Sequence, residues 1–131
     1  THLQSWSIDD EGNEDPGDAT SIDGNRLWVH VADVAALVTP DSELDLEARG
    51  RAGTLYLPEL TATMLPQAMT TQLGMGLQET SPALSFGIDL NDDGSIADVE
   101  VVISQVRVQR LSYNEVDARI DQAPFSQLAA V

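Results

Sequence analysis

The residues most suited to chemistry form a dense acidic run near the start of the chain. Six carboxylates lie between Asp9 and Asp18, and no Lys or Arg precedes Arg26. Like charges this close repel one another, and a cation bound among them relieves that repulsion. Glycines and a proline within the run predict a loop. Carboxylate oxygens in a loop suit Mg²⁺, so the run predicts a Mg²⁺ site; the alternative is a solvated acidic loop without a ligand.

The charge of the whole chain narrows the class of protein. The sequence holds 22 acidic residues against six Arg and no Lys, which gives a formal net charge of −16. Such a surface repels phosphate, which argues against a module that binds nucleic acid by charge alone. A metal-dependent nuclease remains compatible, because its active site is itself acidic. The absence of Cys excludes disulfides and thiolate metal sites.

The sequence also carries no feature that suggests a membrane or secretory protein. No apolar run approaches the length of a membrane span, and the first residues lack a basic-then-apolar signal. We therefore expect a cytoplasmic protein without a membrane partner.

Trp6 and Ile8 lead into the acidic run as a short strand, and two further strands are predicted after it, so that the run would be held on a sheet. Residues 20–22 and 27–32 read as strands joined by a tight turn at residues 23–25. In the second strand, Leu27, Val29 and Val31 share one face, whereas Trp28, His30 and Ala32 share the other. A single His in a strand is expected to be structural rather than a ligand.

The rest of the chain predicts a mixture of helices and strands. Ser42 caps a helix, and residues 54–58 form a short extended run closed by proline. Residues 83–110 alternate as two strands around a turn at 92–95, and a change of phase between Ile103 and Val106 suggests a bulge. A last helix begins after Ser112 and is ended by Pro124. The predicted class is α+β, with a mostly antiparallel or mixed β-sheet and flanking helices.

One segment offers a competing function. The twelve residues from Asp89 to Glu100 match the pattern of an EF-hand calcium loop, with Gly94 at its sixth position. An EF-hand needs a helix on each side, but the flanking residues alternate as strands do. We therefore favour a hairpin turn, with a calcium-binding module as the alternative.

Several blocks of the chain, in order and at matching separations, resemble the catalytic (RNB) domain of the ribonuclease II family. The blocks are residues 8–19, 29–34, 56–58, 64–66, 83–86, 92–96 and 111–116. The resemblance covers nearly the whole chain and implies Mg²⁺-dependent, hydrolytic, processive 3′-to-5′ degradation of single-stranded RNA to 5′-mononucleotides.

The resemblance also assigns residues to the site. The family loop carries four aspartates; Asp9 matches the first, Asp15 the second and Asp18 the fourth, whereas Gly17 stands where the third belongs. The resemblance implies Mg²⁺ at Asp9 and Asp18, and the terminal ribose hydroxyls or a metal at Asp15. Tyr56 matches the tyrosine that stacks near the RNA 3′ end. Glycine has no ligating oxygen, so we expect impaired catalysis.

The resemblance further implies partners outside this sequence. Residues 1–131 correspond to the N-terminal part of an RNB domain, so we expect the remainder of that domain and flanking oligonucleotide-binding modules as partners. His30 and Asp33 lie in a shared block, and we interpret both as structural support for the metal loop. A catalytically inactive protein that binds RNA or another protein is the alternative, because of Gly17.

Overall fold

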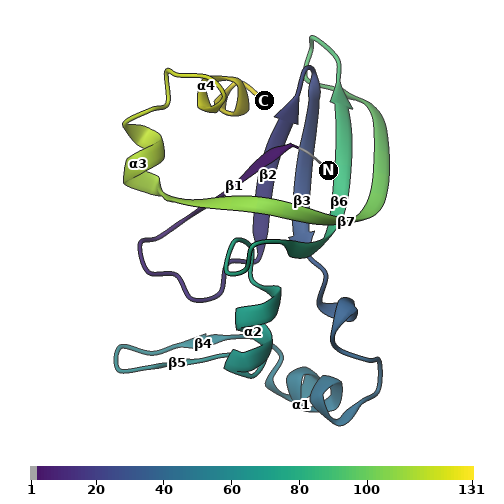
Figure 1. Ribbon diagram of the computed structural model, residues 1–131, viewed down its shortest axis with the longest axis vertical. Helices are drawn as coiled ribbons and strands as arrows, with labels where there is room; N and C mark the ends of the chain where they lie inside the picture. The colour runs from purple at the N-terminus through teal and green to yellow at the C-terminus, as the bar shows by residue number, and fades with distance from the viewer. Residues whose placement is uncertain (1–2) are drawn as a thin grey trace.

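The computed structural model describes residues 3–131, and its centre is a five-stranded sheet that closes into a barrel. The strands follow one another around the barrel in the order β1-β2-β3-β6-β7 (Figure 1). All neighbours pair antiparallel except β1 and β7, which are parallel and close the sheet. The predicted mixed sheet and α+β class are therefore confirmed. The strands are β1 (Gln4–Asp9), β2 (Asp18–Asp23), β3 (Arg26–Ala32), β6 (Ser81–Leu90) and β7 (Ile96–Ser112).

The remaining elements form two groups outside the barrel. Between β3 and β6 lie a 3₁₀ turn η1 (Val34–Ala36), α1 (Glu43–Arg51), β4 (Leu55–Tyr56), β5 (Thr61–Ala62) and α2 (Gln67–Leu73). After β7 follow α3 (Tyr113–Asp117) and α4 (Phe125–Ala129). Figure 1 shows the first group beyond the end of the barrel at which the β1–β2 loop emerges. That loop is the acidic run.

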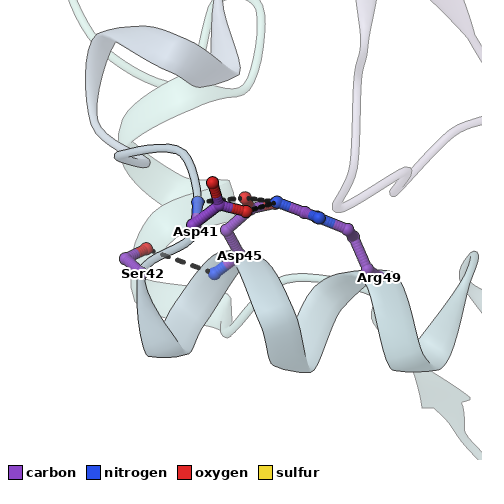
Figure 2. A network of polar contacts seen from close by, with 4 residues as sticks. All are labelled: Asp41, Ser42, Asp45 and Arg49. Atoms are coloured by element: carbon purple, nitrogen blue, oxygen red, sulfur yellow. Dashed lines mark hydrogen bonds and ion pairs between the residues drawn. The ribbon is translucent and has the colours of Figure 1, made fainter.

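Helix α1 begins with the predicted cap and a cluster of charges (Figure 2). The Ser42 hydroxyl accepts a hydrogen bond from the Asp45 amide at 3.3 Å, and Arg49 bridges the carboxylates of Asp41 and Asp45. Hydrogen bonds from Arg49 hold the pKa of Asp45 below its usual value. At the other end of α1, Arg51 donates to the Thr63 carbonyl at 3.1 Å. The helix is thereby tied to the segment after β5.

Much of the interior of the barrel is polar. Five serines on its strands are at most 2 % exposed, and His30 is fully buried among them. The two ring nitrogens of His30 hydrogen-bond the hydroxyls of Ser21 (2.8 Å) and Ser85 (2.7 Å). Trp28 stacks parallel to His30 and covers Gly87, where a Cβ atom would lie 2.8 Å from the indole ring. His30 is therefore the structural residue that the sequence predicts.

Many apolar side chains of the same strands face outward, although Ala19, Ala83 and Val106 are buried. Along β6, Ser81, Ala83, Ser85 and Gly87 are buried, whereas the alternating positions, among them Leu84 and Phe86, are only half-buried. On β7, three β-branched residues share the outer face, namely Val99, Val101 and Ile103, with Ile103 81 % exposed. The alternation was predicted correctly, but alternation alone does not indicate that small polar residues make up much of the interior.

The predicted bulge between Ile103 and Val106 is wrong. Pairing between β6 and β7 continues in one register from Ser81 opposite Val106 to Asp89 opposite Asp98, and the irregularity lies between Asp89 and Leu90. The apolar residues change phase because they change face: Ile103 points outward, whereas Val106 is fully buried in the barrel. A change of face needs no extra residue.

The C-terminal helix also differs from its prediction. The cap is correct, since Ser112 and Glu115 form a reciprocal capping box, but α3 ends at Asp117. Pro124 precedes a second helix, α4, rather than ending the first. Proline is tolerated at a helix start because no intrahelical acceptor awaits its missing N–H there. Phe125 then packs edge-to-face on Trp6 at 5.7 Å.

The residues from Asp89 to Glu100 form the predicted hairpin between β6 and β7. The turn is closed by the Asp93 carboxylate, which accepts from the Ser95 amide at 2.9 Å. Both flanks are strands, so the EF-hand interpretation is wrong. No helix within residues 3–131 combines the length and the apolar character that a membrane span requires.

The buried imidazole predicts a pH dependence of stability. Burial lowers the pKa of His30 from 6.5 to about 4. The unfolded chain therefore binds a proton near pH 6.5, whereas the folded chain does so only near pH 4. As the pH is lowered from 6.5 to 4, the free energy of unfolding therefore falls. We expect His30 to contribute a loss of about 3 kcal/mol from pH 7 to pH 4, measured by urea unfolding. A His30→Gln variant should lack this slope, and an equal slope in both proteins would contradict the prediction.

Candidate functional site at the acidic loop

The acidic loop connects β1 to β2 and begins at the parallel seam of the barrel. Asp9 ends β1 opposite Ser112 of β7, and its carboxylate accepts from the Ser7 hydroxyl at 3.1 Å. Asp18 begins β2 opposite Val31. The two outer acidic residues are therefore placed by strand pairing rather than by the loop.

Main-chain hydrogen bonds fix the second half of the loop. The Pro16 carbonyl accepts from the Met75 amide, and the Gly17 carbonyl accepts from the Ala32 amide, both at 2.9 Å. Met75 is fully buried and Pro16 is buried beside it. The backbone that leads into Asp18 is consequently tied both to the end of β3 and to the segment after α2.

A side chain from β7 holds the first half of the loop. The guanidinium of Arg110 donates to the Asn13 carbonyl. Within the loop, the Asn13 amide donates to the Asp10 carbonyl at 3.1 Å, and the Asn13 side chain accepts from the Asp15 amide at 3.0 Å. Asn13 is thus the centre of the local hydrogen bonds.

The β4–β5 hairpin is joined to the loop through Thr54. The Thr54 hydroxyl donates to the Asp15 carboxylate and accepts from the Met64 amide, each at 3.3 Å. Tyr56, on β4, is 68 % exposed. The base of the hairpin therefore fixes Tyr56 relative to Asp15.

Two depressions lie between the hairpin and the loop, and Tyr56 lines both. One has a volume of about 440 Å³ and includes Asp15. The other has a volume of about 360 Å³ and includes Asp9 and Tyr113. The structure thus brings Asp9, Asp15 and Tyr56 around one surface, whereas exposed Asp18 is not among the residues that line these two depressions.

Gly17 is not required by the backbone. It is exposed, its φ lies in the ordinary range, and a Cβ atom built on it would meet no atom within 4 Å. A Cβ atom therefore fits at position 17, and neither the backbone conformation nor a neighbouring atom requires glycine there.

The carboxylates do not form a metal site in their present arrangement. Within residues 3–131, no three His, Cys, Asp or Glu side chains are grouped closely enough to hold a metal ion. Gly17, which lies between Asp15 and Asp18 in the sequence, has no side-chain oxygen to add to the set. As arranged within residues 3–131, Asp9 and Asp18 are not grouped with a third such donor, so the assignment of Mg²⁺ to them stays a prediction.

Three residues around the loop were not singled out as functional from the sequence. Tyr113 adds a second aromatic wall, Thr54 connects the hairpin to Asp15, and Arg110 supports the loop. Thr54 and Tyr113 gave no signal, because they lie far from the loop in sequence. Arg110 could have been suspected, since alternation along β7 places it on the inner face with Val106.

Asp33 lies at the start of η1, and its amide donates to the Pro82 carbonyl at 3.0 Å.

Comparison with known proteins supports the resemblance over the whole chain. The RNB domain family matches residues 1–130. An uncharacterized ribonuclease of Synechocystis sp. is 40% identical over 124 residues, which cover 89% of this chain and 19% of that protein. The chloroplastic/mitochondrial ribonuclease II of Arabidopsis thaliana is 40% identical over 114 residues, or 82% of this chain and 14% of that protein.

Solved structures agree with the sequence relatives. RNase R of Mycoplasma genitalium, in complex with ribose-methylated single-stranded RNA, has a TM-score of 0.82 at 25% identity, over 92% of this chain and 20% of that chain. The yeast pseudonuclease Ssd1 shares the fold, with a TM-score of 0.81 at 24% identity, over 98% of this chain and 17% of that chain. This chain spans about a fifth or less of the length of these proteins. On the match over residues 1–130, the chain belongs to the RNB domain family, whose named relatives include ribonucleases II and R.

Proposed function

We propose that this chain contributes one wall of the RNA site in a ribonuclease II-type exoribonuclease. The activity would be Mg²⁺-dependent, hydrolytic, 3′-to-5′ and processive on single-stranded RNA, with release of 5′-mononucleotides. The observation that carries the proposal is the shared surface on which Tyr56 stands beside Asp9 and Asp15. The complex of M. genitalium RNase R with single-stranded RNA supports RNA as the ligand.

Each residue around this surface has a chemical role that its position permits. The exposed ring of Tyr56 can stack on a base, which needs no particular base identity. The Asp15 carboxylate can accept hydrogen bonds from the terminal ribose hydroxyls, because Thr54 leaves oxygen lone pairs free. A bound Mg²⁺ would supply activation of water and neutralisation of charge at the phosphate. In this chain Asp9 and Asp18 are its assigned ligands, and Gly17 contributes none.

The charge of the chain requires help from other parts of the protein. With a net charge of −16, this part repels an RNA backbone. We therefore infer that the remainder of the RNB domain and flanking oligonucleotide-binding modules supply the positive surface that holds RNA. A cytoplasmic location is part of the same proposal.

A catalytically inactive RNA-binding or protein-binding domain is the second candidate. It is favoured by Gly17 and by the absence of a three-carboxylate cluster within residues 3–131. The two candidates share the same binding surface and differ in hydrolysis. Mg²⁺-dependent release of mononucleotides from single-stranded RNA by the complete protein, with and without a carboxylate at position 17, distinguishes them.

Removal of the Tyr56 ring should weaken RNA binding. We expect Tyr56→Ala to lower the affinity for a single-stranded oligonucleotide by about 1–3 kcal/mol, the usual range for loss of a base–aromatic stack. Tyr56→Phe retains the ring and should bind within about twofold of the parent. The measurement is fluorescence anisotropy of a 5′-labelled RNA with the complete protein.

Leu60→Ala is the matched control for Tyr56→Ala. Leu60 is an exposed apolar residue between β4 and β5, and it does not line either depression. Its replacement should leave the affinity unchanged. Equal losses in the two alanine variants, or no loss in Tyr56→Ala, would contradict the placement of RNA on this surface.

A further inference from the structure

Arg110 lies directly beneath the acidic loop. Its side chain lines two depressions that both include Gly12: one of about 370 Å³ with Asp9 and Asp10, and one of about 300 Å³ with Glu14. The loop therefore passes over Arg110, with carboxylates on either side. On β7, Arg110 stands opposite Ser7, two residues before Asp9 on the neighbouring strand.

Packing against Gly76 fixes the aliphatic part of the Arg110 side chain, here called its stem. Gly76 has a φ of +80°, and a Cβ atom there would lie 2.8 Å from Cγ of Arg110 and 3.0 Å from the Val108 carbonyl. A glycine at this point lets the stem lie flat on the main chain. The guanidinium is thereby aimed at the loop, where it donates to the Asn13 carbonyl.

The other arginines of the chain are engaged elsewhere. Four of them form ion pairs outside the loop, and the fifth lies over the Phe125 ring; they are Arg26, Arg49, Arg51, Arg107 and Arg119. Within residues 3–131, Arg110 is accordingly the one arginine that lines the depressions around the loop. A guanidinium in this place offsets part of the repulsion among the loop carboxylates.

We infer that Arg110 is a positioning residue for the acidic loop. Its hydrogen bond to the Asn13 carbonyl and its charge hold residues 10–15 in the path that places Asp15 on the surface shared with Tyr56. Arg110 acts through the loop, not by touching RNA. The inference deepens the proposed function and rests on it for the identity of the ligand, but the effect on the loop stands independently.

The test compares Arg110→Met, Arg110→Lys and Arg107→Met in the complete protein. Methionine keeps an apolar stem of similar length without the donor or the charge, and lysine restores both in a different geometry. Arg107 lies on the same strand, is 72% exposed and reaches only Glu79 at 3.4 Å, so Arg107→Met is a control for the loss of one positive charge.

Two measurements are made on each variant. Amide hydrogen exchange at Asn13 and Asp15 reports on the loop, since both amides are hydrogen-bonded inside it. Fluorescence anisotropy with a single-stranded RNA oligonucleotide reports on ligand binding. In Arg110→Met we expect exchange at these two amides to rise about tenfold or more relative to the barrel amides, with a similar loss of RNA affinity. Arg110→Lys should stay within about threefold of the parent, and Arg107→Met should change neither measurement.

Each result bears on a different part of the inference. If exchange at the loop amides and at the barrel amides of Arg110→Met rises by the same factor, the inference is overturned. An equal rise in loop exchange in Arg107→Met also overturns it. Weaker RNA binding with unchanged loop exchange also overturns it, because Arg110 would then contact RNA directly. If the loop responds as expected while even the parent protein fails to bind RNA, the positioning role is supported and the proposed function is not.

Discussion

Replacement of Gly17 by Asp is expected to raise Mg²⁺-dependent release of mononucleotides from single-stranded RNA by about a hundredfold or more. The reason is the missing negatively charged carboxylate between Asp15 and Asp18. Since nothing lies within 4 Å of a Cβ atom at position 17, the added Cβ atom requires no rearrangement of the neighbours. The measurement is the rate of mononucleotide release by the complete protein, with and without Mg²⁺.

Two control variants separate charge from shape at position 17. Gly17→Asn adds a side chain of the same shape without a negative charge, and Gly17→Ala adds only a methyl group. Neither should raise the rate. If the parent protein already cuts as fast as Gly17→Asp, the third carboxylate is dispensable or replaced by a neighbour such as Asp10. If none of the proteins cuts, the inactive RNA-binding or protein-binding candidate is the better description.

Replacement of His30 by Ala is expected to lower the free energy of unfolding by about 3–5 kcal/mol, because it combines a buried cavity with lost hydrogen bonds. His30 is fully buried, and its ring bridges the hydroxyls of Ser21 and Ser85. After truncation, the Ser21 hydroxyl loses its side-chain partner inside the barrel, although Ser85 keeps its contact with Ser104. The free energy of unfolding of a small domain is about 5–15 kcal/mol in total, so this single change removes a large share of it.

Urea unfolding measures the effect, with a control on the same strand. Val31 lies one residue beyond His30 on the outer face and is 42% exposed. Val31→Ala should therefore lower the free energy of unfolding by less than about 1 kcal/mol. A His30→Gln variant, which keeps side-chain hydrogen-bonding groups, should fall between the two. Similar losses in His30→Ala and Val31→Ala would show that the polar interior does not carry the stability of the barrel.

The sequence was most informative where one local rule decides the structure. The cap at Ser42, the capping box at Ser112 and the turn at residues 92–95 each depend on neighbouring residues, and the structure confirms all three. The closure of the barrel could not be predicted in this way. It depends on the parallel pairing of β1 with β7, whose partners are about a hundred residues apart, from Gln4 opposite Arg107 to Asp9 opposite Ser112.

The site was predicted in its residue types and only partly in its arrangement. Asp9, Asp15 and Tyr56 share a surface because Thr54 joins the hairpin to the loop, a contact between residues 39 positions apart. Alternation likewise predicted which side chains of β3 share a face, but not which face is inside. A rule that places only apolar residues in the core is incomplete here, because buried Ser and His side chains share the narrow barrel with Trp28, Ala83 and Val106.

The polar lining of the barrel has a calorimetric consequence. Exposure of apolar surface raises the heat capacity on unfolding, whereas exposure of polar surface lowers it. The interior of this barrel releases hydroxyl and imidazole groups to water, while residues such as Ile103 are already largely hydrated in the folded state. We therefore expect a heat-capacity increment per residue below the usual range of about 12–15 cal/mol/K, and with it a flatter dependence of stability on temperature.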